Sequence, residues 1–277
     1  MKNWDKWIND AVECLKHYIK QYKLKSVVLG LSGGIDSTVS AVICYLATKD
    51  NPSVTFIGRS LPIMNPTNEK SISKKLGETL CDDFAEIDMR EFYHPWRLLF
   101  YEEEEESKAT NISDGNLMAR MRMMYLYQLA NHYKGIVIDT DNATEHELGF
   151  YTVHGDIGDY NVGIRYLWKH EIWELAEVLK NYVPAAANAI QESINLQPTD
   201  GNTGGTDMDQ IAPGATYGDV DFILNSLRNR FTYRDAIEKC GFDLVDRIDR
   251  RVGANYYKRE LPIVPRIMKQ WFNEDDI

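Results

Sequence analysis

Apolar residues follow two spacings along this chain of 277 residues. Between Trp4 and Tyr22 they recur every three or four positions, which predicts an amphipathic helix. Short apolar runs at Ser26–Leu31, Ser53–Leu61 and Lys134–Thr140, and an alternating run at Asp83–Met89, predict four strands. Helical spacing returns between and after these strands, over Asp36–Thr48, Asn68–Cys81, Glu91–Phe100, Asp114–Tyr133 and Lys169–Asn181.

This alternation of strands and helices predicts an α/β fold with a parallel sheet flanked by helices on both faces. Beyond Pro184 the chain reads as irregular, and Leu196–Ala215 is its loosest part. We expect a single domain, with a core at about 22–182 and a C-terminal part at about 183–277. That second part should hold a lid loop and a helical appendage, since helical spacing resumes over Tyr217–Leu227, Tyr233–Lys239 and Leu244–Val252.

Charge and composition narrow the classes of partner. Thirty-one basic against 42 acidic residues give a net charge of −11, which argues against non-specific nucleic-acid or anionic-membrane binding. No apolar run is long enough to span a bilayer, and the first 20 residues lack the apolar segment of a signal peptide. The four scattered cysteines suit reduced thiols. We therefore expect a cytoplasmic protein with neither nucleic-acid nor membrane partners.

A glycine-rich turn, Leu29–Thr38 ("LGLSGGIDST"), joins the first predicted strand to the next helix. Its backbone amides and the hydroxyls of Ser32 and Ser37 suit an anion at a helix N-terminus. Asp36 would repel a phosphate unless a divalent metal lay between them. The turn lacks the lysine of a Walker A loop and the GxGxxG spacing of a dehydrogenase. A simple capped strand–helix turn is the alternative interpretation.

The segment after the fourth strand, Asp139–Asn161, should open on the same edge of the sheet, because ligands of such sheets lie beyond the carboxyl ends of the strands. Asp139 and Asp141 flank that strand end, either as an acid pair or as caps. The histidines share no spacing of a zinc site. The acidic run Glu102–Glu106 is expected to be a solvated surface segment.

"LSGGIDST" resembles the signature of the N-type ATP pyrophosphatases, which cut ATP between its α- and β-phosphates. Five further blocks resemble one member of that superfamily, the ammonia-dependent NAD synthetases, and keep its order from about residue 10 to residue 265. They are "GNLMARMRMMYLYQLAN" (Gly115–Asn131), "DTDNATEHELGFYTVHGD" (Asp139–Asp156), "LWKHEIWELAEVL" (Leu167–Leu179), "PTDG" (Pro198–Gly201) and "YYKRELPIVP" (Tyr256–Pro265).

This resemblance implies ATP-dependent amidation of nicotinic acid adenine dinucleotide to NAD, through an acyl adenylate, with ammonia as nitrogen donor and Mg²⁺ as cofactor. It implies catalytic roles for Asp36, Glu145 and Lys169, with Asp36 and Glu145 as metal ligands, and a substrate contact for Arg120, Asp156 and Asp159. It implies that ATP and its pyrophosphate are bound by Leu31, Ser32, Gly33, Gly34, Ile35, Asp36, Ser37, Thr140, Lys169 and Thr199.

Each residue also has a simpler interpretation: Arg120 as a solvated helix edge, Glu145 as a first-turn acid and Lys169 as a surface lysine. The sequence departs from the family at "GDIGDYN" (Gly155–Asn161), and Arg59 is displaced by one position from the family's arginine. Two rival functions therefore stay open. They are an N-type ATP pyrophosphatase for another carboxylate or base, and a catalytically silent nucleotide-binding homologue.

The resemblance also implies partners. The family forms homodimers, and the predicted helix Asp114–Tyr133, rich in Met and Tyr, is a plausible part of that contact. The chain contains no glutaminase-like segment, so free ammonia or a separate amidotransferase subunit would supply the nitrogen.

Overall fold

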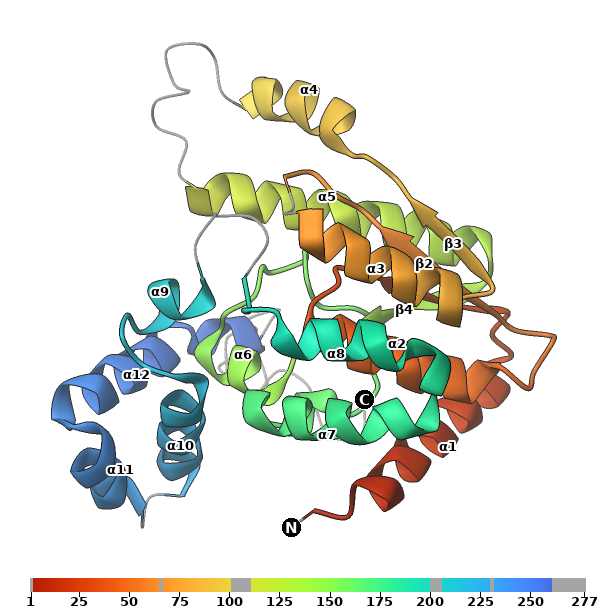
Figure 1. Ribbon diagram of the computed structural model, residues 1–277. Coiled ribbons are helices and arrows are strands. Elements are labelled where there is room, and N and C mark those ends of the chain that lie inside the picture. The colour runs from red at the N-terminus through yellow and green to blue at the C-terminus, as the bar shows by residue number, and fades with distance from the viewer. Residues whose placement is uncertain (1, 65–66, 101–110, 200–205, 230–231, 261–277) are drawn as a thin grey trace, which may run out of the picture.

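A five-stranded parallel sheet lies at the centre of the computed structural model, which describes residues 2–64, 67–100, 111–199, 206–229 and 232–260 (Figure 1). The strand order is β3-β2-β1-β4-β5, and every pair is parallel. Because the order reverses at β1, the loops after β1 and β4 open next to each other. The strands are β1 (Ser26–Gly30), β2 (Thr55–Ser60), β3 (Asp83–Glu86), β4 (Gly135–Asp139) and β5 (Tyr160–Asn161).

Two hydrophobic cores cover the two faces of this sheet. In β1, Val27 and Leu29 face one core and Val28 faces the other, as the alternation of a strand requires. The first core packs under α1 (Trp4–Tyr22), α2 (Ile35–Thr48), α3 (Thr67–Leu80), α7 (Lys169–Tyr182) and α8 (Ala187–Asn195). The second packs under α4 (Arg90–Phe100) and α5 (Asn111–His132), which lie on the opposite side in Figure 1.

A third core belongs to the C-terminal helices, which gather beside α6 at one end of the molecule (Figure 1). Leu148 of α6 packs there with Val220 and Val245, and α10 also contacts α7. The helices of this group are α6 (Ala143–Leu148), α9 (Asp207–Ile211), α10 (Tyr217–Arg228), α11 (Tyr233–Cys240) and α12 (Phe242–Ala254). Short 3₁₀ turns are η2 (Ile164–Tyr166), η3 (Pro184–Ala186) and η5 (Tyr256–Glu260).

The predicted α/β fold is confirmed, with each predicted strand and helix present within a few residues of its expected bounds. The prediction of irregular chain beyond Pro184 was wrong, because α8 begins three residues later. Sequence reasoning also missed β5, α6 and α9, which are too short for a periodic pattern.

Some predicted features lie outside the described residues. They are the acidic run Glu102–Glu106, residues 200–205 of the expected lid loop, and the closing segment after Glu260. Within the described ranges, no helix combines the length and the apolar character needed to cross a membrane.

Candidate active site

The carboxyl ends of β1, β2 and β4 open into a cleft of about 440 Å³. The loop after β1, the segment after β4, the start of α7 and the chain after α8 all contribute to its walls. Most of the predicted site residues line this cleft, although they come from distant parts of the sequence. They are Leu31, Ser32, Gly34, Ile35, Asp36, Ser37, Thr140, Glu145, Asp156, Lys169 and Thr199.

The glycine loop is built around Gly33, whose φ of +89° lies in the region that favours glycine. A Cβ at this position would stand 2.3 Å from the carbonyl oxygen of Glu69, so no larger residue fits without displacement. Ser32 Oγ lies 3.0 Å from Ser37 Oγ and accepts a hydrogen bond from Gly34 N at 3.1 Å. Gly34 caps α2 without a side-chain hydrogen bond. The first residues of α2 line the cleft, so the free amides of this helix end are available there to bind an anion.

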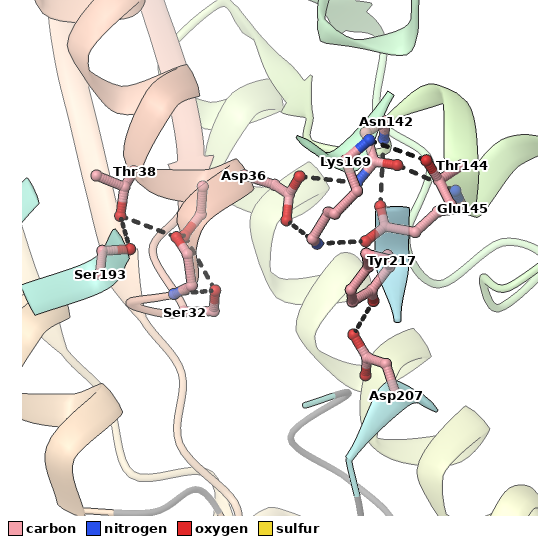
Figure 2. A network of polar contacts seen from close by, with 12 residues as sticks. Ser32, Asp36, Thr38, Asn142, Thr144, Glu145, Lys169, Ser193, Asp207 and Tyr217 are labelled. Carbon is pink, nitrogen blue, oxygen red and sulfur yellow. Dashed lines mark hydrogen bonds and ion pairs between the residues drawn. The ribbon is translucent and has the colours of Figure 1, made fainter. Parts of the chain in front are cut away.

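Ser193 of α8 supports this loop from behind (Figure 2). Its hydroxyl donates to the carbonyl oxygen of Gly33 at 3.1 Å and accepts from Thr38 Oγ1 at 2.9 Å. Ser193 is fully buried and lies 160 positions from Gly33 in the sequence. Sequence reasoning missed this residue because it missed α8.

Lys169 lines the cleft, and its side chain lies between two carboxylates (Figure 2). Its Nζ is 2.6 Å from Asp36 Oδ2 and 2.9 Å from Glu145 Oε1. The lysine side chain is 3% exposed and the carboxylate side chains 15% each. Asn142 donates to Asp36 Oδ1 at 2.8 Å and forms a capping box with Glu145 at the start of α6. The three predicted catalytic residues thus form one charge cluster.

For both Lys169 and Glu145, burial and the opposite charge of the partner shift the pKa in opposite directions. Burial lowers the pKa of Lys169, but Asp36 and Glu145 outweigh it and keep that pKa above its ordinary value. Burial raises the pKa of Glu145, against the opposing effect of Lys169. Lys169 is therefore a permanent cation, and the surface-lysine interpretation is wrong for a side chain this buried.

Residues at the start of helix α10 support Lys169 and the start of α7. The ring of Tyr217 lies 5.4 Å from Lys169 Nζ, and its hydroxyl donates to Asp207 Oδ2 at 2.6 Å. One turn further along α10, Asp221 accepts from Thr144 Oγ1 at 2.5 Å, and Thr144 Oγ1 accepts from Lys169 N at 2.9 Å. None of these supporting residues stood out in the sequence, because a tyrosine and an aspartate one turn apart are common on helices.

The structure places three predicted residues outside the residues that line the cleft. Gly33 is one, and its role is in the turn. Arg120 donates from Nε to the carbonyl oxygen of Val153 at 3.2 Å. Asp159 accepts from Val137 N at 2.9 Å and from Tyr127 Oη at 3.0 Å, so both its carboxylate oxygens support β4 and α5.

Three other residues of the cleft have defined partners. Arg59 lines the cleft but donates to the carboxylate of Asp83 at 2.8 Å. Asp156 accepts from the amide of Thr152 at 2.5 Å, and burial raises its pKa. Thr199 Oγ1 donates to Glu69 Oε1 at 2.8 Å, which brings the chain after α8 against α3.

The donor set of the cleft fits a hard divalent cation bound together with phosphate. Across the described residues, no cluster of three or more His, Cys, Asp or Glu side chains could hold a metal alone. Asp36 and Glu145 nevertheless share one cation already and face the cleft. Magnesium is typically bound by one or two carboxylates together with substrate phosphates, and two carboxylates placed in this way fit such a site.

Comparison with known proteins gives a consistent picture. The family model described as NAD synthase matches residues 7–262. The NH(3)-dependent NAD(+) synthetase of Fusobacterium nucleatum is 31% identical, with 94% of this chain and 95% of that protein covered. That of Methanosarcina mazei is 30% identical, with 94% and 97% covered. The solved structure of NMN synthetase from Francisella tularensis superposes with a TM-score of 0.78 at 27% identity, over 96% of this chain and all of that one.

Proposed function

Since this chain belongs to the NAD synthase family, we propose that it amidates nicotinic acid adenine dinucleotide to NAD with ATP and ammonia. The reaction releases AMP and pyrophosphate. One observation carries the proposal beyond the family match: Lys169, Asp36 and Glu145 form a buried charge cluster where the glycine loop meets the segment after β4. That cluster is suited to the phosphates of ATP.

The chemistry explains why ATP is needed. A carboxylate resists attack by ammonia, because its negative charge repels nucleophiles and oxide is a poor leaving group. The substrate carboxylate attacks the α-phosphorus of ATP and becomes an acyl adenylate, from which ammonia displaces AMP. No side-chain nucleophile takes part, so the protein acts by holding and orienting its substrates.

The glycine loop is proposed to hold the β- and γ-phosphates. Ser32, Ser37 and the first residues of α2 line the cleft, and the free amides at this helix N-terminus are suited to bind an anion. In this structure the Ser37 hydroxyl donates to the carbonyl oxygen of Gly34 at 3.0 Å, so it would have to turn to reach a phosphate. Lys169 adds a cation that can turn from its carboxylate partners to a phosphate. Thr140 and Thr199 line the same cleft and are proposed as further nucleotide contacts.

Asp36 and Glu145 are proposed as the magnesium ligands. When bound, the metal would neutralise charge that develops on the departing pyrophosphate. The protein's own part is to present the two carboxylates with fixed orientations. Asn142 supplies this constraint, since its side chain bonds both Asp36 and the backbone of Glu145.

Asp156 remains the proposed contact to the nicotinic acid dinucleotide, supported by its place in the cleft.

We also propose a homodimer that uses α4 and α5, because Phe92, Leu98 and Leu99 of α4 and Met124 of α5 are exposed apolar side chains. A substitution such as Met124→Glu should then shift the molar mass measured by light scattering towards the monomer. An unchanged dimer, or a monomeric wild-type protein, would contradict this.

The function is tested by incubating the protein with ATP, MgCl₂, NH₄Cl and nicotinic acid adenine dinucleotide, and by measuring AMP and NAD. We expect the two products in equal amounts, and neither product when the dinucleotide is omitted. Asp36→Asn should abolish both, whereas Asp10→Asn, at an exposed site on α1, serves as the matched control. A parallel reaction contains nicotinic acid mononucleotide, the acid that corresponds to NMN. Turnover of the mononucleotide alone, or of neither acid, would overturn the proposal.

A further inference from the structure

Helix α6 is too short to hold its own shape. Its residues, Ala143–Leu148, form less than two turns, and helices of this length are not stable in isolation. Its first turn nevertheless carries Glu145, whose Oε2 accepts from Asn142 N at 3.2 Å and whose Oε1 accepts from Lys169 Nζ at 2.9 Å. The orientation of this carboxylate therefore depends on what fixes the two ends of α6.

The two ends of α6 are fixed in different ways. The capping box of Asn142 and Glu145 closes the N-terminal end within the helix itself. At the other end, Gly149 turns the chain with a φ of +59°, and Phe150 N donates to the carbonyl oxygen of Glu145 at 2.9 Å. The carbonyl groups of the last turn have no partner within a helix, so further donors must come from elsewhere.

Two cations of η5 supply donors at the C-terminal end of α6. Arg259 Nη1 donates to the carbonyl oxygen of Glu147 at 2.6 Å, across 112 positions of the sequence. Lys258 Nζ donates to the carbonyl oxygens of Gly149 and Tyr151 at 2.7 and 2.8 Å. Positive charge also complements the dipole at this end of a helix. The last turn of α6 and the residues after it are thus tied to the C-terminal part of the chain.

The segment that carries Arg259 packs directly against this end of α6. A Cβ at Gly149 would stand 2.4 Å from the Cβ of Asn255, which follows α12. Arg259 Nη2 donates to the carbonyl oxygen of Val252, in the last turn of α12, at 3.3 Å. Its guanidinium group lies 5.0 Å from the ring centre of Tyr256. One arginine side chain therefore joins the carbonyl ends of α6 and α12.

We propose that Arg259 is a positioning residue for the metal site, which holds the last turn of α6 and thereby fixes the orientation of Glu145 in the first turn. This rests on the proposed function, in which Glu145 is a magnesium ligand. A helix of this length spans only about 9 Å, so a displacement of its last turn reaches its first. Residues that orient a metal ligand contribute to metal affinity without touching the metal.

The variant Arg259→Met tests this role, because it removes the donors but keeps an apolar side chain. Binding of Mn²⁺, which prefers the same oxygen ligands as Mg²⁺, is measured by electron paramagnetic resonance with α,β-methylene-ATP present. We expect the Kd for Mn²⁺ to rise about tenfold, as for loss of a group that orients a metal ligand. The Mg²⁺ concentration at half-maximal rate should rise by a similar factor, with kcat at saturating Mg²⁺ within about twofold of wild type. A merely structural role would lower the fraction of active enzyme, and so kcat, without changing either constant.

Arg228→Met is the matched control. Arg228 also contacts α6, but its Nη2 pairs with the side-chain carboxylate of Glu147 at 2.5 Å, and its own side chain is 46% exposed. This variant removes the same charge beside the same helix and leaves the main-chain contact intact, so the Kd for Mn²⁺ should not change. Arg259→Lys retains one donor but loses the fork that reaches both Glu147 and Val252. Its Kd should lie between those of wild type and Arg259→Met.

An unchanged Kd for Mn²⁺ in Arg259→Met, an equal rise in Arg228→Met, or a loss of kcat with an unchanged Mg²⁺ requirement would each overturn the positioning role. If Arg259→Met does not fold, Arg259→Gln decides, because its shorter, uncharged side chain cannot reach both carbonyl groups, and an unchanged Kd there contradicts the role. The Mn²⁺ measurement needs no dinucleotide. Failure of the proposed function, in which wild type binds Mn²⁺ but forms no NAD, is therefore a separate result, and the Kd values of the variants still decide the role of Arg259.

Discussion

Replacing Lys169 with Met should destabilise the folded protein strongly at pH 8. Methionine retains most of the apolar stem, which packs near the ring of Tyr217, but it removes the cation that Asp36 and Glu145 share at 2.6 and 2.9 Å. Two buried carboxylates then face each other without their counter-ion. The change isolates the charge, because the side-chain volume is nearly conserved.

The magnitude follows from the burial of this pair. Removing one partner of a buried ion pair costs about 3–5 kcal/mol, and the 3% exposure of the Lys169 side chain places it in that class. Each kcal/mol corresponds to a shift of about 2–4 °C in the unfolding temperature of a protein near this size. The expected decrease is therefore about 6–20 °C. It should be smaller at pH 5, where Glu145 can take up a proton and remove one of the two charges.

Thermal unfolding followed by circular dichroism at pH 5 and pH 8 measures this effect. Lys75→Met is the matched control, because Lys75 Nζ contacts both carboxylate oxygens of Glu192 at 2.7 Å but is about half exposed. It should change stability by less than about 1 kcal/mol. Equal unfolding temperatures for Lys169→Met and wild type at pH 8 would refute the buried charge cluster, and a loss independent of pH would refute its electrostatic origin.

Three further substitutions test other parts of the cleft. Gly33→Ala should cost more than about 2 kcal/mol in urea unfolding, from its left-handed φ and the 2.3 Å approach to Glu69 O, whereas Gly34→Ala at φ −72° should cost less than half as much. Equal losses would contradict the turn geometry. Ser193→Ala removes the donor to the buried Gly33 carbonyl and should cost about 1–3 kcal/mol in the same assay; a neutral change would show that this contact contributes nothing. Burial raises the pKa of Asp156, so its stabilising contribution at low pH is lost as pH rises through the folded-state pKa. Asp156→Asn should therefore unfold at a higher temperature than wild type at pH 8, with a difference that shrinks towards pH 4, and a difference independent of pH would refute this.

The sheet and its long helices could be predicted because their apolar residues are strong and regularly spaced. The bounds of α1 coincide with the predicted Trp4–Tyr22. Helix α8 escaped prediction for a physical reason. Its buried face consists of Ala189, Ile190 and Ser193, two small residues and one large one, so the apolar stripe is weak. Its burial is decided by contacts with α7, α3 and α2, which are distant in the sequence.

The residues of the cleft likewise divide into those that the sequence could predict and those that it could not. Asp36 and Glu145 could be predicted to lie in the cleft because each belongs to a short segment that follows a predicted strand of the parallel sheet. Asp221 could not, since its contact with Thr144 spans 77 positions. Asp159 shows the converse case, in which neighbours in the sequence do not fix where a side chain lies. It follows the glycine-rich segment that reaches the cleft, but its carboxylate turns back to β4 and to Tyr127.

Lys169 occupies a position at which the residue preferences of helix ends disfavour a lysine. It is the first residue of α7, where the helix dipole is positive and a lysine is normally unfavourable. Asp221 offsets this conflict, because its buried carboxylate accepts from His170 N and from the ring of His170 at that same helix end. The carboxylates of Asp36 and Glu145 then hold the side chain. Helix α10, outside the sheet, is thus what allows a buried cation at the start of α7, so the C-terminal helices contribute to this charge cluster.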